Sequence, residues 1–286
     1  MTNSSEIQYA SDSGQKSALY RILRSAYRFW RDIVKPKNPT VIQTSISGTT
    51  HLIWKNEDIG WKIITTGSFE PEDIRYLKNT LEPGDTFLDI GANVGLFSLP
   101  AAKAVGPSGH VFAFEPIKRN ALMLQLSAEL NGLANIISLV EHPASNESGL
   151  SVEIEIPGGD GSYAYMKGSD ANLGKKRIST VTIDEILKNS VASKIRAMKI
   201  DIEGAELLAL EGAHELLSDF ERSPDIVMAE LIPEYLSRFG HNLHDVESFF
   251  KKYNYEANFL SGNTLRPITN LLESKSRNII FKKNKV

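Results

Sequence analysis

The sequence predicts a doubly wound α/β protein, in which helices cover both faces of a largely parallel sheet. From residue 86 onward, short apolar runs typical of buried strands alternate with amphipathic segments of helical length. This alternation favours a parallel sheet with crossover helices. The chain has 286 residues, enough for one large domain or two small ones, and it shows no internal repeat.

Composition excludes several kinds of chemistry. The chain has no cysteine, which excludes disulfides, thiolate zinc sites and a cysteine nucleophile. Its net charge of −3 gives no reason to expect nucleic acid as a partner. Residues 1–15 are polar and lack the apolar core of a signal peptide, and no apolar run is long enough to span a bilayer. We therefore expect a soluble, cytoplasmic protein.

The N-terminal part is predicted to be an extension of the main domain. Residues 1–15 are expected to be disordered, and residues 16–35 to form a basic amphipathic helix. Its apolar positions are Leu19, Ile22, Leu23, Ala26, Trp30 and Ile33, and its basic positions are Arg21, Arg24, Arg28, Arg31 and Lys35. Two interpretations stay open. Either the apolar face packs on the main domain, or the helix lies peripherally on an anionic membrane surface or a partner.

Short β-like runs follow at residues 40–47, 51–55 and 61–66, completing an extension over 16–66. The main domain, 67–286, is predicted to open with a helix over 68–81, with Ser68 as N-cap and Pro71 in the first turn. Strands are expected at 86–90, 110–115, 135–141, 194–200, 225–231, 255–260 and 278–283. Helices are expected at 93–105, with a kink at Pro100, and at 118–133, 182–189, 204–217 and 244–254. Residues 149–180 break the rhythm and are predicted to be a hairpin insertion.

The first motif, "LDIGANVG" at residues 88–95, lies between a strand and a helix. Gly91 and Gly95 allow a tight turn and a close approach of the backbone to a ligand. Position 93 is Asn, so the G-x-G-x-x-G fingerprint of dinucleotide-binding proteins is absent. Asp89 ends the strand at the same crevice, where a carboxylate repels phosphates and attracts an ammonium group.

The second motif is "FAFEP", in which Glu115 ends the next strand, 20 residues after Gly95. An acid at this place accepts hydrogen bonds from ribose hydroxyls in nucleotide-binding sheets. The two motifs together require a ligand with a ribose, a positively charged amino-acid end and no essential diphosphate. S-adenosylmethionine fits this description, and NAD fits it poorly.

Four segments in this order resemble the FkbM-type methyltransferases, a branch of the S-adenosylmethionine-dependent class I enzymes. They are "LEPGDTFLDIGANVGLFSL", "GHVFAFEPIKRN", "TVTIDEIL" and "MKIDIEGAELLALEGA". "SFEPEDIRYL" upstream resembles the helix that opens that family's domain. The resemblance covers residues 66–286 and implies a Rossmann-like, seven-stranded mixed sheet whose last strand is antiparallel. It also implies methylation of a hydroxyl on a sugar, glycan or secondary metabolite.

The resemblance implies that Asp89, Gly91 and Gly95 line the methionine end of the cofactor and that Glu115 binds its ribose. Further cofactor-binding residues expected on this basis are Glu70, Asn93, Pro116, Ala144 and Ser145. One stretch departs from the family: "HPASNES" replaces Ala-Leu-Ser-Asp, so Asn146 stands where the acid is expected.

Charged residues gather after the fourth strand, in "MKIDIEGAE". Lys199 and Asp201 are two residues apart and share a strand face, whereas Glu203 and Glu206 are expected on one helix face. Asp201, Glu203 and Lys199 are the predicted catalytic residues, with Asp201 orienting or deprotonating the acceptor and Lys199 acting as an ion-pair partner rather than a base. The alternative is structural, because acids in a first helical turn complement the helix dipole.

Glu230, at the end of the fifth strand, and His142, after the third, are further candidates for the proton-accepting group. Carboxylates also bind Mg²⁺, but the sequence shows no closely spaced set of acidic ligands, so no metal site is predicted. Two other classes stay open: an NAD-dependent sugar oxidoreductase or epimerase, and a cofactor-binding scaffold without turnover. The sequence does not name the acceptor or the oligomeric state.

Overall fold

The computed structural model describes residues 39–155, 165–167, 177–188, 190, 194–274 and 277–284. The predicted disordered segment 1–15 and the basic helix 16–35 lie outside the described residues. Among the described residues, no helix has both the length and the apolar character needed to cross a membrane.

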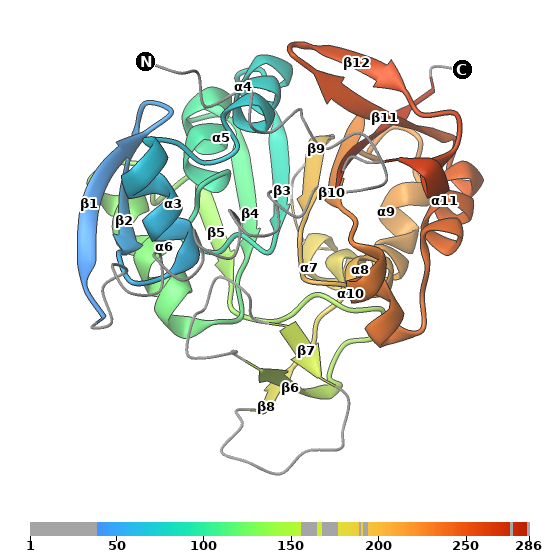
Figure 1. The fold of residues 1–286 in the computed structure, drawn as a ribbon, viewed down its shortest axis with the longest axis horizontal. Helices are drawn as coiled ribbons and strands as arrows, with labels where there is room; N and C mark the ends of the chain where they lie inside the picture. Colours follow the sequence, from blue (N-terminus) through green and yellow to red (C-terminus); the bar gives the residue numbers. More distant parts are fainter. Residues whose placement is uncertain are drawn as a thin grey trace, which may run out of the picture.

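A mixed sheet of eight strands forms the centre of the described fold, in the order β12-β11-β13-β10-β9-β3-β4-β5 (Figure 1). The strands are β3 (Thr86–Ile90), β4 (His110–Phe114), β5 (Ile137–Val140), β9 (Ile195–Ile200), β10 (Ile226–Glu230), β11 (Tyr255–Ser261), β12 (Thr264–Pro267) and β13 (Asn278–Lys283). Strands β5, β4, β3, β9 and β10 are mutually parallel, and β13 pairs antiparallel with β10. The predicted α/β class is confirmed. The sheet has one strand more than the seven expected, because β12 pairs with β11 at the edge.

Helices cover both faces of this sheet. They are α4 (Pro71–Thr80), α5 (Ser98–Val105), α6 (Lys118–Leu130), α7 (Ile183–Leu187), α8 (Glu206–Glu211), α9 (His214–Ser218), α10 (Pro233–Leu236) and α11 (Leu243–Lys252). Successive strand residues face opposite sides, so Phe87 packs in the core under α4 and α5 while Leu88 packs in the core under α8 and α11. Strands buried on both faces explain why their sequences are almost continuously apolar.

The N-terminal segment forms the hairpin β1 (Val41–Ile46) and β2 (Thr49–Trp54), followed by α3 (Asp58–Thr66). Residues 61–66 were expected to be a strand, and that expectation is wrong. Ile59 and Ile63 are four apart and pack into the core from one helix face. Gly67 then ends the helix in the left-handed conformation, with φ 73°. In Figure 1 this hairpin lies beyond β5, where β2 packs on α6.

Three helix boundaries also differ from the prediction. Ser68 does not cap α4, since Glu70 precedes the helix and Pro71 is its first residue. Helix α5 begins only at Ser98, so Pro100 lies in the first turn, where proline is tolerated, and not in the helix interior as expected. The helix expected over 204–217 is divided into α8 and α9 at Gly212. A Cβ on Gly212 would lie 2.1 Å from the Ser145 carbonyl oxygen, so only glycine leaves room for that carbonyl.

The segment between β5 and α7 forms a separate three-stranded antiparallel sheet in the order β7-β6-β8 (Figure 1). Its strands are β6 (Ser151–Glu155), β7 (Tyr165–Lys167) and β8 (Arg177–Ser179). Strands β6 and β7 pair as a hairpin, and β8 adds a strand that the sequence did not predict. Ile154 of β6 lines the large cavity described below, so this sheet contributes to the wall of the site.

Candidate active site

A cavity of about 350 Å³ lies at the carboxyl ends of β3, β4, β9 and β10. This is where doubly wound sheets bind their ligands, because loops from neighbouring strands diverge there. Ten of the predicted site residues line it: Glu70, Asp89, Gly91, Asn93, Glu115, Pro116, Ala144, Lys199, Asp201 and Glu203. Two do not. Gly95 and Ser145 lie outside the cavity wall.

The turn after β3 brings the backbone close to the cavity. Gly91 has φ 88°, and a Cβ on it would lie 2.0 Å from the Asp201 carbonyl oxygen. Its N–H and that of Ala92 both donate to the Phe114 carbonyl, at 3.0 and 2.9 Å. Gly91 therefore must be glycine for the turn to fit against β9. Gly95 is important for packing instead, because a Cβ on it would lie only 3.0 Å from Cγ of Leu124 in α6.

Asp89 is a buried carboxylate with one unused oxygen. Oδ2 accepts a hydrogen bond from Ser98 Oγ at 2.5 Å. Oδ1 is buried and has no hydrogen-bond partner among the described residues. Burial raises the pKa of Asp89, and the nearby Lys199 ammonium opposes that rise. A buried acceptor without a partner is costly, so this oxygen is suited to a cationic donor of a ligand.

Glu115 ends β4 and is also buried. Oε1 accepts the Ile117 N–H and Oε2 the Asn93 N–H, both at 2.8 Å. Asn93 is held in the left-handed conformation, with φ 50°. Burial raises the pKa of Glu115 to about 7. Each carboxylate oxygen keeps a second lone pair, so Glu115 can still accept bonds from two adjacent hydroxyls.

Lys199 and Asp201 form the ion pair that the sequence predicted, with Nζ 3.1 Å from Oδ2. The Lys199 ammonium also lies 4.8 Å from the centre of the Phe97 ring. Burial opposes its charge, but the Asp201, Asp89 and Glu70 carboxyls outweigh burial and raise the pKa of Lys199. Lys199 is therefore a permanent cation and not a base. The Asp201 side chain keeps 27% of its surface exposed, which leaves it accessible from the cavity.

Glu203 and Glu206 do not share a helix face, contrary to the prediction. Glu203 precedes the helix with φ 58°, and Glu206 is the first residue of α8. Glu206 Oε1 accepts the N–H groups of Ile202 and Gly204, each at 3.0 Å, and so braces the turn from inside. Glu203 lines the cavity instead, and burial raises its pKa to about 7.

Of the remaining predicted residues, Glu70 and His142 line the cavity and Ser145 does not. Glu70 has φ 40° and lines the cavity, and burial raises its pKa to about 7. Ser145 lies behind Ala144, where its N–H donates to the Val181 carbonyl at 2.9 Å. His142 also lines the cavity, while its Nδ1 is 2.8 Å from the Ser179 carbonyl oxygen.

Several cavity residues were missed by sequence reasoning. Tyr235 stands five residues after Glu230 and lines the wall together with it. The end of a predicted strand at Glu230 was the sequence signal for Tyr235, because the residues that follow a strand end in this fold lie near the ligand site. Lys62 of α3 and Arg277 before β13 carry no local motif, and only the fold brings them to the cavity. No group of three or more His, Asp or Glu side chains suited to a metal ion occurs in the part of the chain that the structure describes.

Comparison with known proteins decides the family. The model of the FkbM methyltransferase domain matches residues 89–257, more than half of the chain. The chain belongs to the FkbM methyltransferase family. Its cofactor is S-adenosylmethionine. The turn at Gly91 and the unpartnered Asp89 oxygen fit a ligand with an ammonium group, as this cofactor has.

Among curated relatives of this FkbM protein is the hexuronic acid methyltransferase AglP of Haloferax volcanii. It is 25% identical over 195 residues, which cover 68% of this chain and 75% of the relative. Similar solved structures include an S-adenosylmethionine-dependent O-methyltransferase from Thermotoga maritima, at 14% identity and TM-score 0.42, covering 88% of this chain and 80% of that one. Another is a methyltransferase from Agrobacterium tumefaciens, at 13% identity and TM-score 0.45, covering 87% and 72%.

Proposed function

We propose that this FkbM methyltransferase methylates a hydroxyl oxygen of an acidic sugar. The observation that carries the proposal is the position of Asp201. It is a partly exposed carboxylate at the carboxyl end of β9, and its backbone oxygen contacts the Gly91 turn. A carboxylate at this point is suited to accept the proton of a hydroxyl that approaches the methyl donor.

The cofactor is proposed to lie across the ends of β3 and β4. Asp89 Oδ1 would accept a bond from the ammonium of the methionine end, and Glu115 would accept bonds from the ribose hydroxyls. Gly91 lets the backbone approach between them. This arrangement leaves the cavity wall formed by Asp201, Glu203 and Tyr235 for the acceptor.

Two exposed cations that line the cavity support an acidic sugar. Lys62 lies with its ammonium 4.6 Å from the centre of the Phe69 ring, and Arg277 lines the same cavity. Both are exposed, unlike Lys199. A carboxylate on the acceptor would pair with either of them, while the floor of the cavity is acidic and would repel it. The relative that acts on hexuronic acid agrees with this choice.

Methyl transfer to oxygen is an in-line displacement that depends on alignment. When bound, S-adenosylmethionine supplies a methyl group on a sulfonium sulfur, which leaves with the bonding electrons as a thioether. Asp201 is proposed to orient the acceptor oxygen and to accept its proton as the carbon–oxygen bond forms. Lys199 holds Asp201 in place through their ion pair.

The test uses labelled S-adenosylmethionine and a panel of hexuronic acids, free and joined to a glycan or lipid carrier, with mass spectrometry of the products. Asp201→Asn should lower kcat by a factor of about 100 or more, the usual contribution of a positioned proton acceptor. It should leave the Kd for S-adenosylmethionine, measured by calorimetry, close to that of the wild type. Glu256→Gln, an exposed change on β11, is the matched control and should not alter kcat.

Methylation of a hexuronic acid on oxygen by the wild type, lost in Asp201→Asn, would support the proposal. A methylated nitrogen or carbon in the product would contradict it, as would an Asp201→Asn variant with normal kcat.

A further inference from the structure

Glu230 and Asp201 lie side by side on neighbouring parallel strands. The register of β10 on β9 pairs Met228 with Lys199 and Ala229 with Ile200. Continued by one residue, it places Glu230 beside Asp201. Because in-register residues of parallel strands point to the same side, both side chains point to the face that carries Lys199. Both carboxyl groups also line the same small cavity.

A second, smaller cavity of about 20 Å³ adjoins the first, and it is unusually acidic. Its walls include four carboxyl groups, those of Glu70, Asp73, Asp201 and Glu230. Lys199 is the only cation among the described residues that line it. One ammonium cannot compensate four negative charges that are this close together, since like charges in a largely desolvated site do not all ionise.

The partners of these groups indicate which one keeps a proton. The Lys199 ammonium bonds to Asp201, 3.1 Å away, and so favours the ionised form of that residue. Asp73 Oδ2 accepts a bond from Asn278 Nδ2 at 3.3 Å. Asn278 also pairs with Glu230 across β13 and β10, so the strand on the other side of Glu230 presents a neutral amide. Within the part of the chain that the structure describes, Glu230 forms no ion pair.

The charged groups facing Glu230 come from three directions. They are Asp201 and Lys199 on β9, Glu70 and Asp73 at α4, and Arg277 before β13. Burial comes first, and Asp201 second, among the causes that raise the pKa of Glu230 to about 8. Lys199 opposes this rise. The direction agrees with the charge balance of the smaller cavity.

We propose that Glu230 is a positioning residue which remains protonated in the working enzyme and donates a hydrogen bond to the Asp201 carboxylate. Asp201 is then held from two sides, by Lys199 and by Glu230, with its remaining lone pairs directed to the acceptor. The proton of the acceptor hydroxyl passes to Asp201 when the new carbon–oxygen bond forms, and Glu230 keeps its own. The inference rests on the proposed function of Asp201.

The first test needs no acceptor. Carbon-13 NMR of the full chain, labelled at the glutamate side-chain carboxyl, follows each acid through a pH titration. At pH 7 the wild type should show a protonated glutamate resonance that Glu230→Gln removes and Glu70→Gln, the matched change in the same cavity, retains. Asp201→Asn removes the neighbouring charge and should weaken the proton affinity of Glu230 at least about tenfold. A Glu230 resonance that is ionised at pH 7, or one that Asp201→Asn does not shift, would overturn the proposal.

The second test separates positioning from proton acceptance. Glutamine donates a hydrogen bond as a protonated glutamate does, and leucine donates none. Glu230→Gln should therefore exceed Glu230→Leu in kcat by a factor of about 10 or more, the value of a buried bond to a charged group. We also expect the kcat of the wild type to fall above pH 8, where Glu230 ionises, and the kcat of Glu230→Gln to lack that fall. Equal losses in both variants would make Glu230 the proton acceptor and overturn the inference.

If no hexuronic acid is methylated by the wild type, the proposed acceptor fails. The NMR titration still decides whether Glu230 and Asp201 share a proton, so the two failures are distinguishable.

Discussion

Buried charges in this protein are explained by neighbours on the adjacent strands. Asp89 on β3 is in register with Lys199 on β9, and Lys199 bonds to Asp201 two residues later. Each of these groups would be costly to bury alone. The cost is offset where several strand ends meet, which is also where the chemistry is needed. The lysine within an otherwise apolar strand is therefore part of the construction of the site.

His51 is a buried histidine outside the site, and it gives stability a specific dependence on pH. Its Nε2 is 2.7 Å from Thr49 Oγ1, and its Nδ1 has no partner among the described residues. Burial lowers its pKa from 6.5 to about 4. Between these values the unfolded chain binds a proton that the folded chain does not. The free energy of unfolding should thus fall as pH drops from 6.5 to 4, by about 3 kcal/mol from this residue.

Urea unfolding at pH 7 and pH 4 checks this prediction. His51→Gln should lose less stability than the wild type over that interval, because glutamine does not titrate. His244→Gln alters an exposed histidine and should follow the wild type. If His51→Gln and the wild type lose the same free energy, His51 does not carry the effect.

The sequence predicted the residues of the site that stand at strand ends. Asp89, Glu115 and Asp201 follow apolar runs, so their position at the carboxyl edge followed from the strand pattern alone. Ser145 was misplaced because a single residue decides which side of an extended segment faces the cavity. The Glu230–Asp201 pairing depends on strand order, and local pattern does not specify which strands are neighbours.

At the scale of elements, the turn from β9 into α8 fixes the cavity wall to which we assign the acceptor. Glu206 bonds the turn from within, and α10 packs against it at Gly204. The sequence predicted one continuous helix here, because the apolar periodicity continues through Gly212. Tertiary contact with the Ser145 carbonyl overrides that periodicity. Similarly, the run 61–66 is rich in β-branched residues, yet packing of Ile63 makes it a helix.

Substitution of Gly204, the glycine of this turn, should strongly reduce stability. It has φ 111°, and a Cβ on it would lie 2.3 Å from the Tyr235 carbonyl oxygen. Gly204→Ala therefore forces α10 away from the turn and should cost about 2–4 kcal/mol. Gly262→Ala is the matched control, because Gly262 also has a positive φ, 62°, but no atom lies within 4 Å of its Cβ position. It should cost only about 1 kcal/mol. Equal losses of stability in urea would show that the contact with Tyr235 is unimportant.

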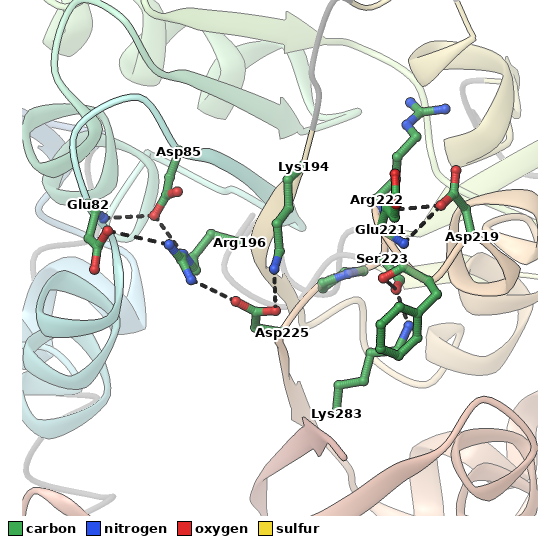
Figure 2. A network of polar contacts seen from close by, with 12 residues as sticks. Glu82, Asp85, Lys194, Arg196, Asp219, Glu221, Arg222, Ser223, Asp225 and Lys283 are labelled. Atoms are coloured by element: carbon green, nitrogen blue, oxygen red, sulfur yellow. Dashed lines mark hydrogen bonds and ion pairs between the residues drawn. The ribbon is translucent and has the colours of Figure 1, made fainter. Parts of the chain in front are cut away.

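On the scale of the whole molecule, the carboxyl and amino ends of the strands carry different features. The carboxyl ends of the strands carry the cavity, and the amino ends carry a network of ion pairs (Figure 2). Arg196, at the start of β9, bonds to Asp85 before β3 and to Asp225 before β10, each at 2.8 Å. Lys194 adds a contact to Asp225 at 2.9 Å. This network ties together the three central strands at the end remote from the cavity.

Arg196→Met should therefore weaken the fold without weakening cofactor binding. The Arg196 side chain is 26% exposed, so solvent screens its three ion pairs, with Glu82, Asp85 and Asp225. The loss should be about 1–3 kcal/mol in the free energy of unfolding. Methionine keeps the aliphatic packing, which confines the effect to the lost bonds. Lys251→Met is the control: the Lys251 side chain is 68% exposed, so breaking its pair with Glu247 should cost less than about 0.5 kcal/mol. Urea unfolding measures the stability, and calorimetry with S-adenosylmethionine measures the Kd. If Arg196→Met raised that Kd as well, the amino ends of the strands would influence the cavity at their carboxyl ends. The separation of stability and cofactor binding between the two ends would then be wrong.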